Sequence, residues 1–149
     1  MICKLIRLYR KEIISLFEEE EGIMGGFVQF PIYRVHYNQR LINRFLKEYF
    51  KRSHFFYGIR IDHKVVAFLH GYIKPAPRGD IGYIDNMMVS KHYQGRGYAT
   101  LLRNKFYSWL KKNEISYCQL EVLAKNKKAI SVYKKWGFEI DGLRMTKKI

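Results

Sequence analysis

A β-rich run that leads through two glycines into a long amphipathic helix limits the possible folds of this chain more than any other segment. The run covers residues 81–90, the glycines are Gly95 and Gly97, and the helical pattern covers 95–112. The first amides of a helix have no partner within it and, with the helix dipole, they form a site for an anion. Glycine lets a phosphate approach the backbone closely. We therefore expect a strand–loop–helix unit that binds a phosphorylated ligand.

Two other phosphate-binding loops are excluded by the residues after Gly95. A dinucleotide-binding fold requires G-x-G-x-x-G and a nucleotide-binding P-loop requires G-K-[ST], whereas Thr100 stands where the third glycine would be. A lone G-x-G also fits an ordinary strand-to-helix turn. The glycines by themselves leave both interpretations open.

The rest of the hydrophobic pattern predicts one α/β domain spanning 1–149. Three- and four-residue apolar spacing predicts further helices at 11–21, 39–51 and 126–136. Alternating or β-rich runs predict strands at 2–8, 55–61, 64–73, 81–90 and 117–123, with a last pair at 138–140 and 144–149. Asp62-His63 reads as a hairpin turn, 22–37 as a loop or a loop with a short helix, and 74–80 as a loop. Antiparallel strands followed by a strand–helix–strand–helix unit predict a mixed sheet.

The formal net charge of +15 predicts an anionic partner without choosing one. A phosphorylated cofactor, an acidic protein surface and nucleic acid all fit, and a coding bias toward lysine explains part of the excess. No apolar run approaches the roughly 20 residues that cross a bilayer, and early charges at Lys4 and Arg7 interrupt any secretory segment. We expect a cytoplasmic protein without a membrane partner; monomer and homodimer both stay open.

No metal site is expected. Cys3 and Cys118 lie far apart and match no zinc-like interval, so both are interpreted as buried thiols. The five histidines show no ligand spacing.

Two motifs give the chain a resemblance to a known family. The segment 94–99, Gln-Gly-Arg-Gly-Tyr-Ala, resembles the Q/R-x-x-G-x-G/A signature of the GNAT acetyltransferase superfamily. The run 121–138 resembles the family's E-V-x-x-x-N-x-x-A-I-x-x-Y-x-x-x-G-F pattern and follows at the expected distance. Together with the elements between them, the motifs cover about 81–140.

The resemblance implies a fold, a cosubstrate and a set of binding residues. The fold would be a mixed, mostly antiparallel sheet with a central parallel β-α-β unit and flanking helices. Acetyl-CoA would be the acyl donor, and Asn126 would contact it through its side-chain amide, although a helix N-cap role also fits this residue. Arg96 fits either a phosphate partner or a solvated cation. The loop residues implied to hold the diphosphate are Gln94, Gly95, Arg96, Gly97, Tyr98, Ala99 and Thr100, and those implied to give main-chain contacts to the pantetheine arm are Met87, Met88 and Val89.

Amine acetylation needs a neutral amine, a polarised thioester and a proton for the leaving thiolate. Tyr133 matches the family tyrosine that acts as general acid; the alternative is an aromatic on the buried face of its helix. Glu121 and Asp85 match positions that carry the base in some relatives, and water-mediated deprotonation is a third possibility. Alternation places Asp85 on the same side of its strand as Tyr83, Met87 and Val89.

The acceptor is left open by the sequence. Its pocket is expected from 18–37, 74–80 and the last strands. The acidic run 18–21 suits a cationic amine or is a solvated helix end, and the apolar residues of 23–30 line a pocket or pack internally. The leading hypothesis is direct acetylation of a primary amine on a small molecule or a protein. The alternatives are acetylation of aminoacyl-tRNA, as in toxin members of the family, and a domain that binds coenzyme A without catalysis.

Overall fold

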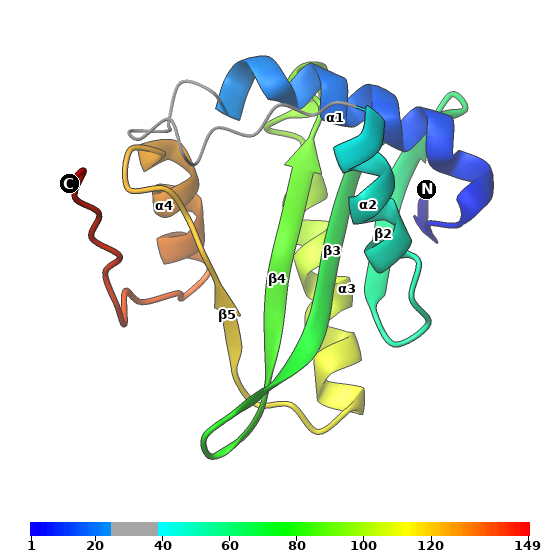
Figure 1. Ribbon diagram of the computed structural model, residues 1–149. Coiled ribbons are helices and arrows are strands. Elements are labelled where there is room, and N and C mark those ends of the chain that lie inside the picture. Colours follow the sequence, from blue (N-terminus) through cyan, green and yellow to red (C-terminus); the bar gives the residue numbers. More distant parts are fainter. Residues whose placement is uncertain (25–38) are drawn as a thin grey trace.

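The computed structural model describes residues 1–24 and 39–149, with the side chains of 1–19 and 40–149, and it is built around a five-stranded sheet (Figure 1). The strands are adjacent in chain order, and every pairing is antiparallel except the last, which is parallel. Their bounds are β1 (Ile2–Lys4), β2 (Phe55–Ile61), β3 (Lys64–Ala76), β4 (Gly79–Val89) and β5 (Cys118–Leu120). This confirms the mostly antiparallel mixed sheet with a parallel β-α-β unit.

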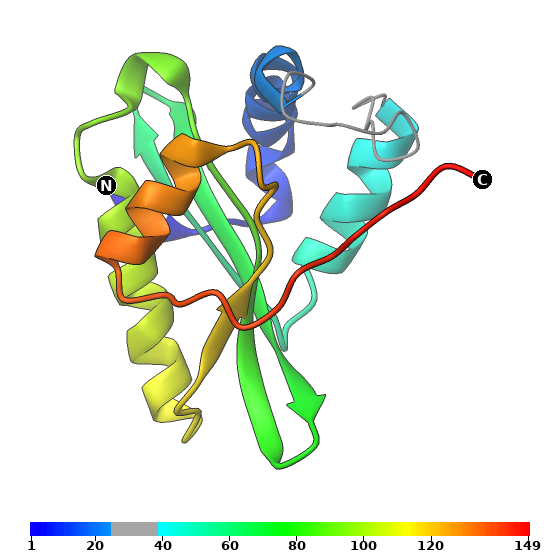
Figure 2. The same ribbon diagram turned by 90° about the vertical axis from the view of Figure 1, so that its left-hand side faces the viewer.

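Helices cover both faces of the sheet (Figure 2). α1 (Arg10–Met24) and α2 (Gln39–Tyr49) lie on one face, and α3 (Tyr98–Lys112) and α4 (Lys127–Lys135) lie on the other. Short 3-10 turns, η1 (Arg7–Tyr9) and η4 (Lys91–Tyr93), precede α1 and follow β4. Of the helices in the described residues, none combines the length and the apolar character that a bilayer crossing requires.

Most predicted elements are confirmed, and three predictions are wrong. α1 continues through Gly22 instead of ending there. The segment 74–80 is the tip of the β3–β4 hairpin, because the ladder continues to Ala76 opposite Gly79, whose φ of 128° permits a tight turn. The strands expected at 138–140 and 144–149 do not form. β5 is only three residues long, so it offers little edge for a further strand.

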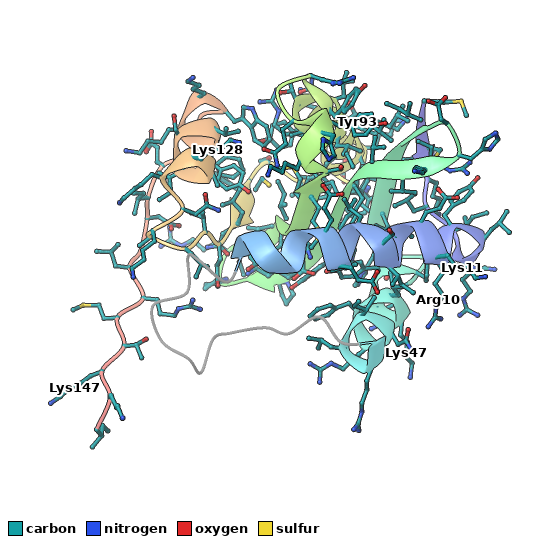
Figure 3. All side chains as sticks on the ribbon, turned by 90° about the horizontal axis from the view of Figure 1, so that it is seen from above. Arg10, Lys11, Lys47, Tyr93, Lys128 and Lys147 are labelled. Atoms are coloured by element: carbon teal, nitrogen blue, oxygen red, sulfur yellow. The ribbon has the colours of Figure 1, made fainter. Side chains whose placement is uncertain are left out.

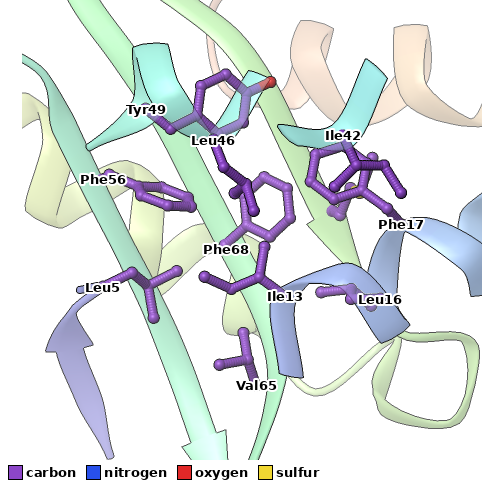
Figure 4. Packing of buried hydrophobic residues seen from close by; sticks show 11 residues of the cluster. Leu5, Ile13, Leu16, Phe17, Ile42, Leu46, Tyr49, Phe56, Val65 and Phe68 are labelled. Carbon is purple, nitrogen blue, oxygen red and sulfur yellow. The ribbon is translucent and has the colours of Figure 1, made fainter. Parts of the chain in front are cut away.

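The core between the sheet and helices α1 and α2 is rich in aromatic rings (Figure 4). Phe68 on β3 lies 5.4 Å from the ring of Phe17 on α1, and Phe56 on β2 lies 5.2 Å from the ring of Tyr49 on α2. Such pairs add to the burial energy of each ring. These contacts fix α2 over the middle of β2 and β3.

On the opposite face, α3 presses closely against β3 and β4. Its Leu102, Phe106 and Leu110, four residues apart, are buried, as their spacing predicts. A Cβ placed on Gly71 would lie 2.7 Å from Phe106, and one on Gly82 would lie 2.5 Å from Leu110. Because these glycines leave no gap beneath α3, the helix is held in register with β4, and its first turn is fixed near the end of that strand.

Candidate active site

A β-bulge in β4 sets which side chains face the two sides of the sheet. His70 of β3 pairs with Asn86 and Gly71 pairs with Ile84, so Asp85 is an extra residue in the ladder. A bulge of this kind re-aims side chains and is frequent next to active sites.

The bulge contradicts the predicted alternation along β4. Met87 and Val89 pack in the cluster under α3, whereas Asp85 bonds His70 on the α2 side of the sheet. Asn86, the residue after the bulge, faces α2 as well, since its amide donates to the Tyr49 hydroxyl at 3.1 Å. The extra residue therefore separates Asp85 from the side of Met87 and Val89.

β4 and β5 pair only near one end and then separate (Figure 1). The parallel register covers 82–84 opposite 118–120, while β4 continues to Val89. Within the described residues, no strand pairs with this edge of β4 beyond Ile84. An open stretch of strand edge offers main-chain donors and acceptors to an extended ligand.

The amide of Val89 points to this open edge. Ser90 N–H donates to the Val66 carbonyl of β3 at 2.8 Å. The Val89 carbonyl belongs to the same trans peptide and so points the other way, where Gln94 Nε2 donates to it at 3.2 Å. In an extended strand, the N–H of a residue points to the same side as its own carbonyl. Val89 N–H therefore faces the space between β4 and β5.

The glycine loop follows directly and opens α3. Gly95 and Gly97 have φ values of 76° and 79°, in the left-handed region, and a Cβ at either would meet nothing within 4 Å. The Leu101 amide is the first that bonds back to the Gly97 carbonyl, at 3.0 Å. The amides of Tyr98, Ala99 and Thr100 precede that first helical bond and lie at the open mouth of the helix.

Hydrogen bonds to three elements, α1, β4 and α4, hold this loop. Gln94 bridges two of them, because its Oε1 accepts from Lys128 Nζ of α4 at 2.7 Å while its Nε2 reaches β4. On the α1 side, Glu19 Oε1 accepts from Ser90 Oγ at 2.9 Å and from the Lys91 amide at 2.6 Å. One carboxylate of the acidic 18–21 run thus supports the loop. Figure 3 looks down on this end, with Tyr93 in the loop and Lys128 on α4.

Basic groups surround the loop. The Arg96 guanidinium lies 5.0 Å from the Tyr93 ring, and Arg103 of α3 lies 4.8 Å from the Trp136 ring after α4. With Lys128, they give the mouth of α3 the positive field that a diphosphate requires.

Asn126 is the N-cap of α4, since its Oδ1 accepts from the Ala129 amide at 3.1 Å. This leaves its Nδ2 for a ligand, so the predicted contact with the cofactor stays a prediction. Tyr133, about two helical turns further along α4, is partly buried and packs against Trp136 and Phe138. Burial raises the pKa of its phenol above the ordinary value of 10.

The two predicted bases lie in different environments. The Asp85 side chain is 36% exposed and is engaged by His70, whereas the Glu121 side chain is 72% exposed beyond β5 and lies 3.5 Å from Arg144. Tyr83 lies between the two carboxylates: burial first, then the charge of Glu121, raises its pKa to about 12.

Two histidines that the sequence did not single out complete this region. Asp85 Oδ2 lies 3.0 Å from Nδ1 of His70, whose Nε2 lies 2.9 Å from Nδ1 of His54. The three residues come from β4, β3 and the segment before β2, so no sequence spacing could reveal them. No group of His, Cys, Asp and Glu suited to a metal occurs in the described residues.

On the acceptor side, part of the pocket expected from 18–37 cannot be compared with the structure, because residues 25–38, with the apolar Phe27, Val28 and Phe30, lie outside the described residues. Cys3 and Cys118, expected to be buried, are both only partly buried, and burial raises the pKa of each thiol.

Comparison with known proteins agrees with this geometry. The sequence model described as the Acetyltransferase (GNAT) family matches residues 13–138. An uncharacterized N-acetyltransferase of Methanocaldococcus jannaschii is 32% identical over 102 residues. That match covers 63% of this chain and 45% of the relative, so the chain spans less than half of the length of that protein.

Solved structures share the whole fold. A provisionally assigned acetyl transferase from Pyrococcus furiosus has a TM-score of 0.77 at 25% identity, covering 100% of this chain and 99% of its own. A ribosomal-protein-alanine N-acetyltransferase from Brucella melitensis has a TM-score of 0.75 at 17% identity, covering 100% and 98%. An aminoglycoside 6'-N-acetyltransferase from Acinetobacter haemolyticus has a TM-score of 0.73 at 14% identity, covering 100% and 99%. At such low identity, the last two likenesses show the fold alone.

Proposed function

Because the chain belongs to the Acetyltransferase (GNAT) family, we propose that it is an N-acetyltransferase that moves the acetyl group of acetyl-CoA to a primary amine. The observation that carries the proposal is the continuous path from the open edge of β4, through the two left-handed glycines, to the first amides of α3. Open space at Gly95 and Gly97 fits a diphosphate against the backbone. Acetyl-CoA supplies the activated thioester.

In this proposal, the chain holds the cosubstrate by its backbone. The amides of residues 95–100 bind the diphosphate, and Gln94 and Lys128 keep the loop in place. Met87 and Val89 give main-chain contacts along the open edge, and Val89 N–H polarises the thioester carbonyl. Main-chain groups of successive residues point to opposite sides of a strand, so those of Met88 face β3 and not the open edge, and its side chain is buried beneath α1 and α2.

Proton transfer falls to two side chains. Asp85 takes a proton from the ammonium, so that a nitrogen lone pair attacks the carbonyl carbon. As the C–S bond breaks, Tyr133 gives its phenolic proton to the thiolate, and the proton lost from the attacking nitrogen restores the phenol through solvent. The raised pKa of Tyr133 keeps it protonated at neutral pH. We favour Asp85 over Glu121 because a carboxylate that is 36% exposed and 3.0 Å from a buried histidine is better fixed than a 72% exposed one.

The acceptor side favours a cation. Asp85 and Glu121 flank the rings of Tyr72 and Tyr83, which lie 5.5 Å apart. Carboxylates and aromatic faces together attract an ammonium group, and the Lys74 ammonium already lies 3.9 Å from the centre of the Tyr83 ring.

The test is release of free thiol from acetyl-CoA with a panel of small amines, peptides and aminoacyl-tRNA. We expect turnover with at least one primary amine. Tyr133→Phe should lower kcat by about 100-fold, the lower end of the range for general acid catalysis. Tyr107→Phe is the matched control, since Tyr107 on α3 is also partly buried with a raised pKa. Saturable binding of acetyl-CoA without turnover on any acceptor would instead indicate a binding domain.

A further inference from the structure

A chain of two histidines stands behind Asp85. His54 Nδ1 lies 2.9 Å from His70 Nε2, and His70 Nδ1 lies 3.0 Å from Asp85 Oδ2. The mechanism proposed above uses only the carboxylate. Neither imidazole takes part in the proposed proton transfers.

The middle ring is fixed by packing. His70 is 1% exposed, and the Tyr49 ring of α2 stacks on it at 3.7 Å with an interplanar angle of 16°. Phe56 meets it edge-on at 6.0 Å. A buried ring with both nitrogens engaged cannot turn without losing both hydrogen bonds, so its orientation is set before any substrate arrives.

The order of donors follows from Asp85. An ionised carboxylate only accepts, so Nδ1 of His70 must carry the hydrogen. In a neutral imidazole, the other nitrogen then accepts, and His54 must donate from its own Nδ1. Both imidazoles are therefore in the Nδ1–H form, and both hydrogen bonds point toward the carboxylate.

We propose that His70 is a positioning residue that holds Asp85 Oδ2, and that His54 supports it by donating to Nε2 of His70 in the tautomer that Asp85 requires. This inference rests on the proposed role of Asp85 as base. With Oδ2 held, Oδ1 is left for the acceptor: the N–H bond of the ammonium breaks, an O–H bond to Asp85 forms, and the electron pair stays on nitrogen.

Charge on the histidine pair would oppose this step. A cationic imidazole beside Asp85 stabilises the ionised carboxylate and so weakens its hold on the proton of the amine. Burial lowers the pKa of both His70 and His54, which keeps the pair neutral at pH 7. The other groups that face the pair are Glu48, Tyr49, Lys51 and Tyr72. Activity should therefore fall as the pair becomes protonated below pH 6.5.

Nitrogen-15 NMR of the histidine rings tests the hydrogen-bond order directly. In the wild-type protein at pH 7.5, His70 and His54 should both show the Nδ1–H tautomer. In Asp85→Ala, the acceptor is gone and His70 should move to the Nε2–H tautomer that free histidine prefers. An Nε2–H tautomer of His70 in the wild-type protein would overturn the proposal.

Kinetics test the positioning role. His70→Phe keeps a ring against Tyr49 but gives no hydrogen bond, so kcat should drop by roughly 10- to 100-fold, the scale of a misplaced catalytic group. KM for acetyl-CoA should not change. His70→Asn, whose amide can still donate to Asp85, should recover most of the loss. His63→Asn, in the exposed β2–β3 turn, is the control.

The variants also separate this inference from the proposed function. His54→Phe leaves the buried ring and Asp85 in place, so His70 should keep the Nδ1–H tautomer but lose its partner at Nε2, with a smaller loss of kcat. The proposal therefore stays testable even when His70→Phe folds poorly. Wild-type turnover that His70→Phe and His54→Phe leave unchanged refutes the inference alone. A wild-type protein that fails to bind acetyl-CoA refutes the proposed function, and the role of Asp85 with it.

Discussion

Substitution of Gly97 by alanine tests whether the glycine loop binds coenzyme A, separately from any effect on the stability of the fold. Gly97 has a φ of 79° and is the N-cap of α3. Gly137, after α4, has a φ of 86°, and a Cβ at either glycine meets nothing within 4 Å. Gly137→Ala is therefore a matched control: it carries the same kind of backbone strain at the end of another helix.

The expected cost to stability is similar for the two variants. A left-handed alanine costs about 1–2 kcal/mol, and the reduced entropy of the unfolded chain returns about 0.4–1 kcal/mol. A net loss of about 1 kcal/mol corresponds to a fall in Tm of roughly 2–4 °C for a domain of this length. Circular dichroism during heating measures this change.

Coenzyme A binding should distinguish them. The methyl group of Gly97→Ala projects into the open space proposed for the diphosphate, and one lost hydrogen bond to a charged group costs about 1.5–3 kcal/mol. The Kd for coenzyme A, measured by isothermal titration calorimetry, should rise roughly 10- to 100-fold. Gly137→Ala should bind as the wild-type protein does. Equal affinities in the two variants would show that the diphosphate does not lie at the mouth of α3.

Three further outcomes follow from burial. Burial raises the pKa of Cys118 to about 12. In a Cys3→Ser background, alkylation of Cys118 at pH 8.5 should therefore be about a thousandfold slower in the folded protein than in the urea-unfolded protein, and comparable rates in the two states would contradict this burial. Phe106→Ala should lower the free energy of unfolding by about 4 kcal/mol in chemical denaturation, since the ring is fully buried under α3, and a loss below 1 kcal/mol would refute that packing. Because burial lowers the pKa of His70 from 6.5, the unfolded chain binds the proton first, and stability should fall as pH drops below 6.5, less steeply in His70→Phe.

The regular elements were predictable because they are encoded locally. The spacing of Leu102, Phe106 and Leu110 reveals the buried face of α3 whatever lies beneath it. The hairpin turn at Asp62-His63 is also encoded locally, since both residues adopt positive φ, as a two-residue turn requires. The glycine loop combines residues that favour positive φ with the start of a helical apolar spacing, so its place at the start of α3 also agrees with the sequence.

The arrangement around Asp85 was not predictable in this way. Nothing in the sequence near Asp85 marks a bulge, since the register depends on how β4 meets β3 at His70 and Gly71. The pairing of His70 with His54 depends on that register in turn. Local patterns therefore located the cofactor side of the site and left the proton-transfer side undetermined.

The bulge connects the two halves of the proposed reaction. In a regular strand, Asp85, Met87 and Val89 would share one side, and Met88 would leave the core that it forms with α1 and α2. The extra residue keeps Asp85 toward α2, where a cationic amine can approach. It also seats Met87 and Val89 under α3, while the Val89 amide faces the gap to β5. Since one irregularity orients both the base and the thioester-binding edge, removal of the bulge would misplace both groups at once, even with every side chain intact.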